Sequence, residues 1–416
     1  AELDDQPQKG RLHGVVIGIK DNICYKGHRS SASSKILENF ISVYSATAVE
    51  RLLNEGAIII GRQNCDEFGM GSSNENSAFG PVLNPVDSNY VAGGSSGGGA
   101  AAVKAGMCIA SLGSDTGGSV RLPADFCGVV GYKPSYGRVS RYGLMAYGSS
   151  FDQIGILANN IDDTAKIWEV ISGPDEFDST AIQDTLPAYP LSSEKKYRIA
   201  YFSEWLDQPS VDPEIVSQIK KYLKELEEKG HHLEPVPFEL TDFIVPTYYI
   251  LTTAEASSNL ARYEGARFGY RSAKPTDDLT SFYQNNRTEG FGKEVKRRIM
   301  LGTFVLSAGY YDAYFTKAQQ VRRQLKDKTD LIFKEFDFLL APTSPSVAYK
   351  LGAKNEDPLA MYMGDIFTVF ANLTGVPAVT LPLFKHSSNL PFGLQLLSSP
   401  HNEVSLLRFS HQMMQQ

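Results

Sequence analysis

Cysteine, histidine and long apolar runs are scarce in this chain, and each shortage excludes a class of protein. Its 416 residues hold four cysteines (Cys24, Cys65, Cys108 and Cys127) and seven histidines. The cysteines stand far apart, so we expect reduced thiols of an intracellular protein and no disulfide scaffold. The histidines show no HExxH or similar spacing, which argues against a metal site. No run of about 18 apolar residues occurs, so no association with a membrane is predicted.

Basic charge is also in short supply. The formal net charge is −7 and the sequence pI is about 5.6. Strong binding of nucleic acid needs a basic footprint, which this chain as a whole lacks. Two local exceptions are the segments EVKRRIM (294–300) and VRRQLKDK (321–328). Both patterns predict helices, and we interpret their charges as solvated helix faces.

An alternation of apolar strands and helices is present in the first half. Buried strands are predicted over 13–22, 57–61 and 108–115. A helix with a Ser/Thr start and a Gly stop is predicted over 45–56, and a small-residue helix over 98–107. This order favours an α/β fold in which helices cover a mostly parallel sheet.

The second half continues the same pattern after a polar, Pro-rich excursion at about 172–196. A helix over 212–230 has an Asp cap, Pro at its first position and a Gly stop. Further strands are predicted over 197–203, 337–345, 377–383 and 392–398. We find no internal repeat, so a single domain over 1–416 is predicted, in which the second half completes the sheet.

The stretch GGSSGGGAAA (93–102) is the most unusual part of the sequence. It is no P-loop, because no Lys follows the glycines until Lys104, and the residue directly after that lysine is neither Ser nor Thr. It is no dinucleotide fingerprint either, since the glycine spacing is wrong. A flexible linker would stay polar, whereas this stretch runs directly into a helix. A catalytic role remains.

A second glycine-serine stretch, SDTGGSVRLPADFCG (114–128), predicts a tight loop that leads from a strand into a helix. Backbone N–H groups in such a loop can converge on an anion, and a serine at its end is a candidate nucleophile. The alternative is a Gly-rich turn that only caps a helix. Neither stretch contains a histidine, so a lysine is the remaining candidate base.

Lys20 ends the first apolar strand, where burial would lower its pKa. The shift must be large, because a lysine with a pKa of about 10.4 is almost wholly protonated at neutral pH. Asp21 would oppose the shift, but adjacent strand residues face opposite sides.

Together the segments GIKDN (18–22), GGSSGG (93–98) and DTGGSVRLP (115–123) resemble the amidase signature family. Lys20 and Ser95 are 75 residues apart, and Ser95 and Ser119 are 24 apart, as that family usually sets its lysine and two serines. The resemblance covers nearly the whole chain. It implies an α/β/α sandwich around a large mixed, mostly parallel β-sheet, with a Ser-Ser-Lys triad.

By this resemblance Ser119 is the acyl-enzyme nucleophile, Ser95 relays the proton and Lys20 is the neutral base. The resemblance also implies a cis peptide bond between Gly94 and Ser95. The oxyanion hole would consist of the backbone amides of Thr116, Gly117, Gly118 and Ser119.

Within the family, four segments resemble the glutaminase components of tRNA-dependent glutamine amidotransferases: 64–85, 131–155, 294–304 and 309–322. Glutamine is a zwitterion, so its pocket needs a cation for the α-carboxylate and an anion for the α-ammonium. The resemblance assigns these roles to Arg298, with Arg297 as the alternative, and to Asp365. It also assigns a pocket tyrosine to Tyr249, which Tyr248 adjoins. The alternative for Arg298 and Asp365 is a structural salt bridge.

The same resemblance implies partners. Ammonia released from glutamine would pass to a B subunit, which uses ATP and Mg²⁺ to convert Glu-tRNA(Gln) to Gln-tRNA(Gln). A small accessory subunit is also implied, while this chain itself would need no cofactor and would leave most tRNA contacts to the partner. Only 19 residues precede Lys20 in this sequence. Proteins of this kind usually carry a segment of about 60 residues before the strand of the lysine. We associate a short start with organellar versions and expect a mitochondrial matrix protein, with a bacterial cytoplasmic protein as the alternative.

Two other functions compete with this interpretation. A free-standing amidase for another small amide would hydrolyse its substrate without a partner and with little preference for glutamine. A non-catalytic scaffold subunit would keep the fold alone, and the intact Lys20, Ser95 and Ser119 argue against it.

Overall fold

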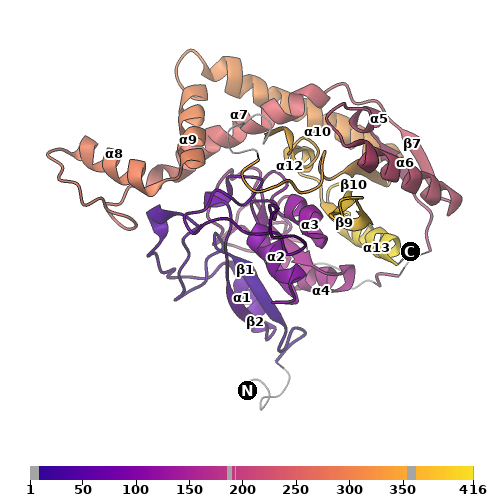
Figure 1. Cartoon of the computed structure of the whole chain (residues 1–416), viewed down its shortest axis with the longest axis horizontal. Helices are drawn as coiled ribbons and strands as arrows, with labels where there is room; N and C mark the ends of the chain where they lie inside the picture. Colours follow the sequence, from indigo (N-terminus) through magenta and orange to yellow (C-terminus); the bar gives the residue numbers. More distant parts are fainter. Residues whose placement is uncertain (1–8, 185–189, 193, 354–361, 416) are drawn as a thin grey trace.

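A ten-stranded sheet organises the described part of the chain (Figure 1). The computed structural model describes residues 9–184, 190–192, 194–353 and 362–415. The strands follow one another across the sheet in the order β2-β1-β3-β5-β4-β9-β10-β8-β6-β7. Their bounds are β1 Val16–Lys20, β2 Ile58–Gln63, β3 Ala110–Asp115, β4 Val130–Lys133, β5 Gln153–Ala158, β6 Arg198–Tyr201, β7 His232–Pro235, β8 Phe338–Pro342, β9 Ala378–Lys385 and β10 Pro391–Ser398.

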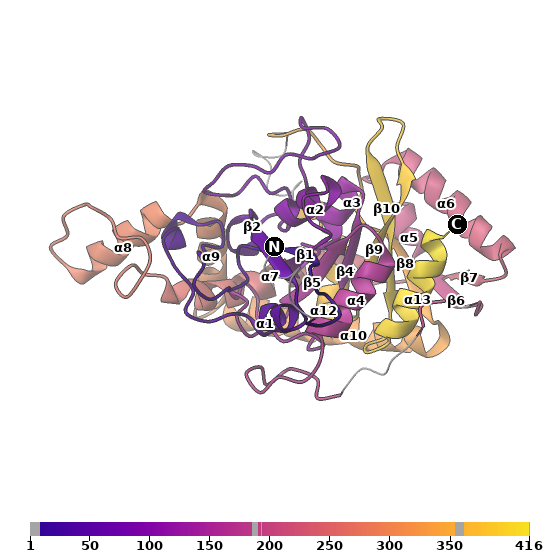
Figure 2. The same ribbon diagram turned by 90° about the horizontal axis from the view of Figure 1, so that it is seen from below.

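Helices lie on both faces of this sheet (Figure 2). Helices α2 and α3 pack on one face, and α1, α4 and α13 on the other, while α7 packs against α9, α10 and α12. The helix bounds are α1 Thr47–Asn54, α2 Gly97–Lys104, α3 Arg121–Cys127, α4 Ile161–Ile171, α5 Ser203–Leu206, α6 Pro213–Glu228, α7 Thr241–Asn259, α8 Leu279–Gly290, α9 Lys293–Val305, α10 Lys317–Glu335, α12 Val369–Thr374 and α13 Glu403–Met414. The predicted α/β/α sandwich is therefore confirmed.

The expectation of a mostly parallel sheet is wrong. Four strand pairings are parallel: β1 with β2 and β3, and β6 with β7 and β8. Five are antiparallel and occupy the centre: β3–β5, β5–β4, β4–β9, β9–β10 and β10–β8. The β-α-β order correctly predicted the first three strands, but β4 and β5 went unrecognised. Antiparallel neighbours need no crossover helix, so the alternation of elements could not reveal them.

The second half of the chain completes this sheet, as predicted. Strands β8, β9 and β10 lie beside β4, and β6 and β7 form one edge. Helix α6 has its predicted cap, since the Asp212 carboxylate accepts a hydrogen bond from the Glu214 N–H at 2.8 Å and Pro213 takes the first helical position. Its apolar stripe is buried, at Ile215, Ile219, Leu223 and Leu226. In the described part of the chain no helix is long and apolar enough to cross a membrane.

Two close approaches set the geometry of the site region. Helix α2 lies against β3 because Gly99 has no side chain: a Cβ there would stand 2.7 Å from the Ser111 hydroxyl oxygen. Helices α7 and α9 cross where a Cβ on Gly302 would stand 1.9 Å from the Thr253 carbonyl oxygen. The first contact places the 93–97 loop over the sheet, and the second brings Tyr249 of α7 toward Arg298 of α9.

Candidate active site

Lys20 lies at the end of β1, and its side chain is fully enclosed, with 1% exposed surface. Its Nζ lies within hydrogen-bonding distance of three hydroxyl oxygens: Ser95 at 2.6 Å, Ser114 at 2.8 Å and Ser96 at 2.9 Å. The Ser114 carbonyl oxygen lies at 3.4 Å. One buried amine therefore connects the glycine-serine loop after residue 93 to the end of β3.

Burial lowers the pKa of Lys20 from its usual value, against the opposing charges of Asp66 and Asp115. Asp21 turns away, as the strand alternation predicted. Its carboxylate accepts hydrogen bonds from the backbone N–H groups of Ser31 at 3.1 Å and Ser33 at 3.0 Å. The lysine is thus separated from the nearest carboxylate in sequence, and burial makes it easier to deprotonate than a free lysine.

A neutral Lys20 fits its surroundings. A neutral amine has two N–H donors and one lone pair. The Ser96 hydroxyl donates its own proton to the Ser114 carbonyl oxygen at 3.1 Å, so toward Lys20 it acts as an acceptor. The Ser114 hydroxyl oxygen supplies the second acceptor. The lone pair then remains for the Ser95 O–H, which lies at the shortest distance.

The loop that carries Ser95 begins with the cis peptide bond expected between Gly94 and Ser95. Ser95 is completely buried, whereas Ser119 keeps 8% exposed surface. The two loops are joined by their backbones, because the Ser96 N–H donates to the Ser119 carbonyl oxygen at 3.0 Å. The structure therefore brings Lys20, Ser95 and the Ser119 segment together, with the partly exposed serine at the outer end.

The loop 115–119 is held by an ion pair beneath it. Arg121 donates from Nη2 to Asp115 Oδ1 at 3.0 Å and from Nε to Oδ2 at 3.2 Å, and both residues are fully buried. Burial alone would raise the pKa of Asp115, but the charge of Arg121 outweighs it and holds that pKa well below its usual range. Asp115 is consequently an anion that organises the loop.

Three of the four amides expected in the oxyanion hole remain available. The Gly118 N–H donates to Asp115 Oδ1 at 2.9 Å, so that group is already used. For the N–H groups of Thr116, Gly117 and Ser119 no acceptor is recorded within the described residues. Gly118 has φ +117°, and a Cβ there would stand 2.2 Å from the Thr368 hydroxyl, so the loop requires glycine.

Arg298 is enclosed by three aromatic rings. Its guanidinium carbon lies 5.3 Å from the ring centre of Tyr249, 5.5 Å from Tyr362 and 5.7 Å from Tyr147. Its Nε donates to Glu294 at 2.9 Å and its Nη1 to the Tyr147 hydroxyl at 2.8 Å.

The Nη2 of Arg298 is buried and has no hydrogen-bond partner among the described residues. Arg298 exposes only 3% of its surface, whereas the side chain of Arg297 is 36% exposed. Arg298 is therefore the cation that can meet an anion inside the protein, and one of its donors is unused.

Asp365 lies across the same aromatic group. Its carboxylate accepts hydrogen bonds from the Tyr249 hydroxyl at 2.7 Å and from the Ser72 hydroxyl at 2.8 Å. The neighbouring Tyr248 has a different place, because its hydroxyl packs directly against Gly117, where a Cβ would stand 2.3 Å away. Tyr249 thus connects the anion to the cation, and Tyr248 connects this region to the loop 115–119.

Several residues of the site escaped prediction from the sequence. Ser96 and Ser114 contact the amine of Lys20. Both residues belong to the glycine-serine stretches 93–102 and 114–128, but the sequence analysis gave them no role. Asp152 accepts a hydrogen bond from the Thr116 hydroxyl at 2.7 Å and another from the Tyr147 N–H at 2.9 Å. Burial raises the pKa of Asp152 to about 6. No spacing rule indicates these partners, which only the fold brings together.

Comparison with known proteins agrees with this geometry. Residues 1–407 match the family described as Amidase. The glutamyl-tRNA(Gln) amidotransferase A chain of Chlorobium phaeobacteroides is 53% identical over 402 residues, which are 96% of this chain and 84% of that protein. The relative of the same name from Koribacter versatilis is 50% identical over 411 residues, 98% of this chain and 85% of that one.

A solved structure has the same fold. The crystal structure of the corresponding glutamyl-tRNA(Gln) amidotransferase component from Thermotoga maritima superposes with a TM-score of 0.83 at 44% identity. The match covers 97% of this chain and 83% of that one.

Proposed function

This chain belongs to the amidase family, and from that membership we propose that it is the glutamine-hydrolysing subunit of a glutamyl-tRNA(Gln) amidotransferase. It is a carbon-nitrogen ligase subunit that uses glutamine as the amido donor. The observation that supports this most directly is the pairing of a buried lysine-serine relay with a buried arginine that keeps one donor unused. The first is the machinery of amide hydrolysis, and the second suits a substrate that carries a carboxylate.

The reaction begins at the side-chain amide of glutamine. The Ser119 hydroxyl oxygen attacks the amide carbon as its proton moves to Ser95, and the Ser95 proton moves to the amine of Lys20. The carbonyl oxygen becomes an anion and accepts hydrogen bonds from the free backbone amides of the 116–119 loop. The proton then returns from Lys20 through Ser95 to the departing nitrogen, so that ammonia leaves and a glutamyl ester of Ser119 remains.

Water completes the cycle by the same proton path. Its oxygen attacks the ester carbon while its proton passes through Ser95 to Lys20. Collapse of the second tetrahedral intermediate returns the proton to Ser119 and releases glutamate. Because Lys20 is neutral at the start of each half-reaction and protonated in the middle, its lowered pKa serves both the uptake and the return of the proton.

Two charged side chains beside the tyrosine rings, Arg298 and Asp365, would recognise glutamine. The Nη2 of Arg298 binds the α-carboxylate, and Asp365 binds the α-ammonium. Glu294 fixes the guanidinium through its Nε, and Tyr147 fixes it through its Nη1. Tyr249 holds Asp365 in place. A fatty amide offers neither charge, so it would leave the buried Nη2 of Arg298 without an acceptor among the described residues.

The ammonia serves a second reaction on a B subunit, which binds ATP and Mg²⁺ and amidates Glu-tRNA(Gln), with a small accessory subunit in the complex. The acidic charge of this chain suits a division in which the partner makes most tRNA contacts. For the compartment we keep the mitochondrial matrix as a proposal, although the relatives described above are bacterial and favour the cytoplasmic alternative. Fractionation of cells that express the complete natural gene decides between the two.

One assay tests the function itself. Ammonia release from glutamine is measured with the purified chain alone, then with its B partner, ATP and Glu-tRNA(Gln). Weak activity that rises with the full set is expected. The free-standing amidase requires strong activity alone, or equal use of other amides, and that result would replace the tRNA-dependent function.

Glutamine hydrolysis should accelerate as pH rises. The lowered pKa of Lys20 means that the neutral base accumulates at a pH below that of a free lysine. Below this pKa, kcat/KM should increase by about tenfold per pH unit, since one proton must leave. A pH–rate profile between pH 5 and pH 9 measures this rise in kcat/KM, with circular dichroism at each pH to confirm folding. A kcat/KM that falls as pH rises over this range would exclude a base that must first lose its proton.

Arg298→Ala should raise KM for glutamine by about 100-fold, because a buried charged hydrogen bond to the carboxylate is lost. Hydrolysis of an uncharged primary amide should change far less. Arg297→Ala is the matched control, since that side chain points toward the surface and pairs with Glu294. Equal losses on both substrates, or equal effects of the two variants, would reject Arg298 as the carboxylate ligand.

A further inference from the structure

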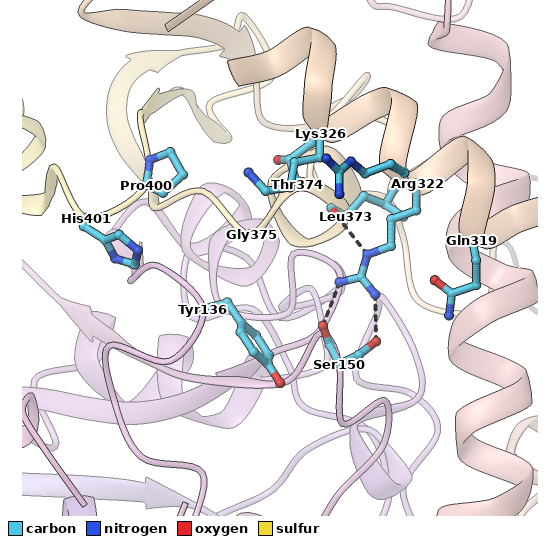
Figure 3. Close-up of a pocket in the computed structure, with 11 residues that line it drawn as sticks. Tyr136, Ser150, Gln319, Arg322, Lys326, Leu373, Thr374, Gly375, Pro400 and His401 are labelled. Carbon is cyan, nitrogen blue, oxygen red and sulfur yellow. Dashed lines mark hydrogen bonds between the residues drawn. The ribbon is translucent and has the colours of Figure 1, made fainter. Parts of the chain in front are cut away.

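A second cavity, of about 510 Å³, lies outside the candidate active site (Figure 3). Helix α10 forms one wall, the end of α12 and Gly375 another, and the turn at Pro400 a third. Lys20, Ser95, Ser119 and Arg298 are not among the residues that line it. Its size falls within the range of sites for small ligands, about 300–1,000 Å³.

The wall formed by α10 is strongly basic. Gln319, Arg322, Arg323 and Lys326 follow one another at intervals of three, one and three residues, which places them on one side of the helix. These are the charges of the segment 321–328 that the sequence pattern predicted to be a solvated helix face. The described lining includes no Asp or Glu. A chain with a net charge of −7 therefore contains a locally cationic cavity.

Two of these cations are available to a ligand. Arg323 pairs with Asp327 at 2.8 Å and Lys326 with Asp330 at 2.7 Å, both one turn along the same helix. The side chains of Arg323 and Lys326 are 77% and 44% exposed. Exposed pairs of this kind contribute little to stability, so both head groups can turn to a bound anion at little cost.

Arg322 has a different role, because it holds the inner wall. Its Nε donates to the Leu373 carbonyl oxygen at 3.0 Å, and its Nη1 and Nη2 donate to the Ser150 hydroxyl and carbonyl oxygens at 2.8 Å each. Its guanidinium lies 4.0 Å from the ring centre of Phe151. Figure 3 shows the hydrogen bonds from Arg322 on α10 to Ser150 and Leu373.

We propose that this cavity binds a small polyphosphate anion, such as pyrophosphate or the polyphosphate of a free nucleotide. Arg323 and Lys326 bind the phosphate oxygens, and Arg322 adds positive potential at the inner wall. Tyr136, Leu373 and Pro400 supply less polar walls beside the charges. The volume of the cavity suits a small ligand.

Occupation of the cavity would reach the active site through the 147–152 loop, an inference that rests on the proposed glutaminase function. Arg322 holds Ser150. Two residues further along, Asp152 holds Thr116 of the oxyanion loop, and Tyr147 holds Arg298. A bound anion that attracts the guanidinium of Arg322 would pull on its hydrogen bonds to Ser150, which hold the 147–152 loop. The cavity is thus an effector site for the same reaction.

Binding is tested by calorimetric titration of the purified chain with pyrophosphate and with ATP in metal-free buffer, without a B subunit. Saturable binding of at least one is expected. Equal affinity for both indicates recognition of the polyphosphate alone, and tighter binding of ATP indicates a contact to the nucleoside. The double variant R323Q/K326Q should weaken binding by about tenfold or more per lost cation.

The matched control is K328Q/K334Q, which removes the same charge from α10 outside the cavity and should bind as the wild type does. Equal weakening by both double variants, or no saturable binding by the wild type, would overturn the site. In the glutaminase assay a saturating ligand should change KM or kcat by about fivefold or more. Binding without this change would overturn the coupling only. A chain without glutaminase activity would contradict the proposed function and leave the binding result intact.

Discussion

Ser119→Ala is expected to abolish ammonia release from glutamine, with a loss of about a millionfold in kcat. The variant removes the oxygen that forms the acyl-enzyme, and no neighbouring group replaces it. Ser95 is fully buried, while Ser119 is the serine with exposed surface at the end of the relay. The measurement is single-turnover ammonia release, together with mass spectrometry for a glutamyl adduct after rapid quenching with acid.

The fold of this variant should be intact. Ser119 contributes its backbone carbonyl to the link with Ser96, and alanine keeps that carbonyl. The thermal midpoint of Ser119→Ala should therefore match that of the wild type. A folded variant that still releases ammonia at the wild-type rate would exclude Ser119 as the nucleophile.

Lys20→Met is expected to lower kcat by about 100- to 10,000-fold, which is the usual contribution of a positioned base. Methionine approximately keeps the length and volume of the side chain but has no lone pair to accept the Ser95 proton. Lys20→Arg should be equally inactive at every pH, because arginine stays protonated. Steady-state ammonia release across the pH range measures both variants.

The two lysine variants should differ in stability. Lys20 is buried and its ammonium form is disfavoured, so an apolar methionine should be tolerated, whereas arginine brings a permanent charge into the same space. Urea unfolding should give Lys20→Met a free energy of unfolding close to that of the wild type and Lys20→Arg a lower one. Wild-type activity in Lys20→Met would show that Ser95 needs no base.

The pH dependence of stability should follow the same shift. Between the lowered pKa of folded Lys20 and the ordinary pKa of the unfolded chain, the unfolded state binds more protons. The free energy of unfolding should therefore rise with pH through this window. Lys133, whose pKa burial lowers to about 7, acts in the same direction. The Lys20 part of this rise should be absent in Lys20→Met, which separates the two lysines.

Local pattern predicted part of the outer architecture. The cap of α6, the strand that ends at Lys20 and the small-residue helix α2 all depend on neighbours within a few residues, and the structure has them. The antiparallel centre was not predicted. Strands β4 and β5 pair with each other and with β9 and β3, and no short-range signal states which distant strand lies alongside.

The same division holds within the site. Glycine spacing and two serines predicted the candidate catalytic loops, because a tight anion-binding turn needs glycine at defined places, and the family resemblance added the role of each serine. The choice between Arg297 and Arg298 depended on helical phase: α9 turns Arg298 inward to three aromatic rings and leaves Arg297 at the surface. Tyr248 and Tyr249 were separated in the same way, one against Gly117 and the other on Asp365.

The amino-acid sequence by itself therefore determined the family, the candidate nucleophile, relay and base, and the elements whose ends are marked by caps and glycines. Tertiary structure alone decided that Ser96 and Ser114 surround the amine of Lys20, that the Gly118 amide is used by Asp115, and that the 321–328 charges line a cavity. The physical reason is the distance along the chain over which each kind of interaction acts. Turns and caps are determined by atoms a few residues apart, whereas burial, pKa shifts and unused donors depend on groups that meet only when the whole sheet has assembled.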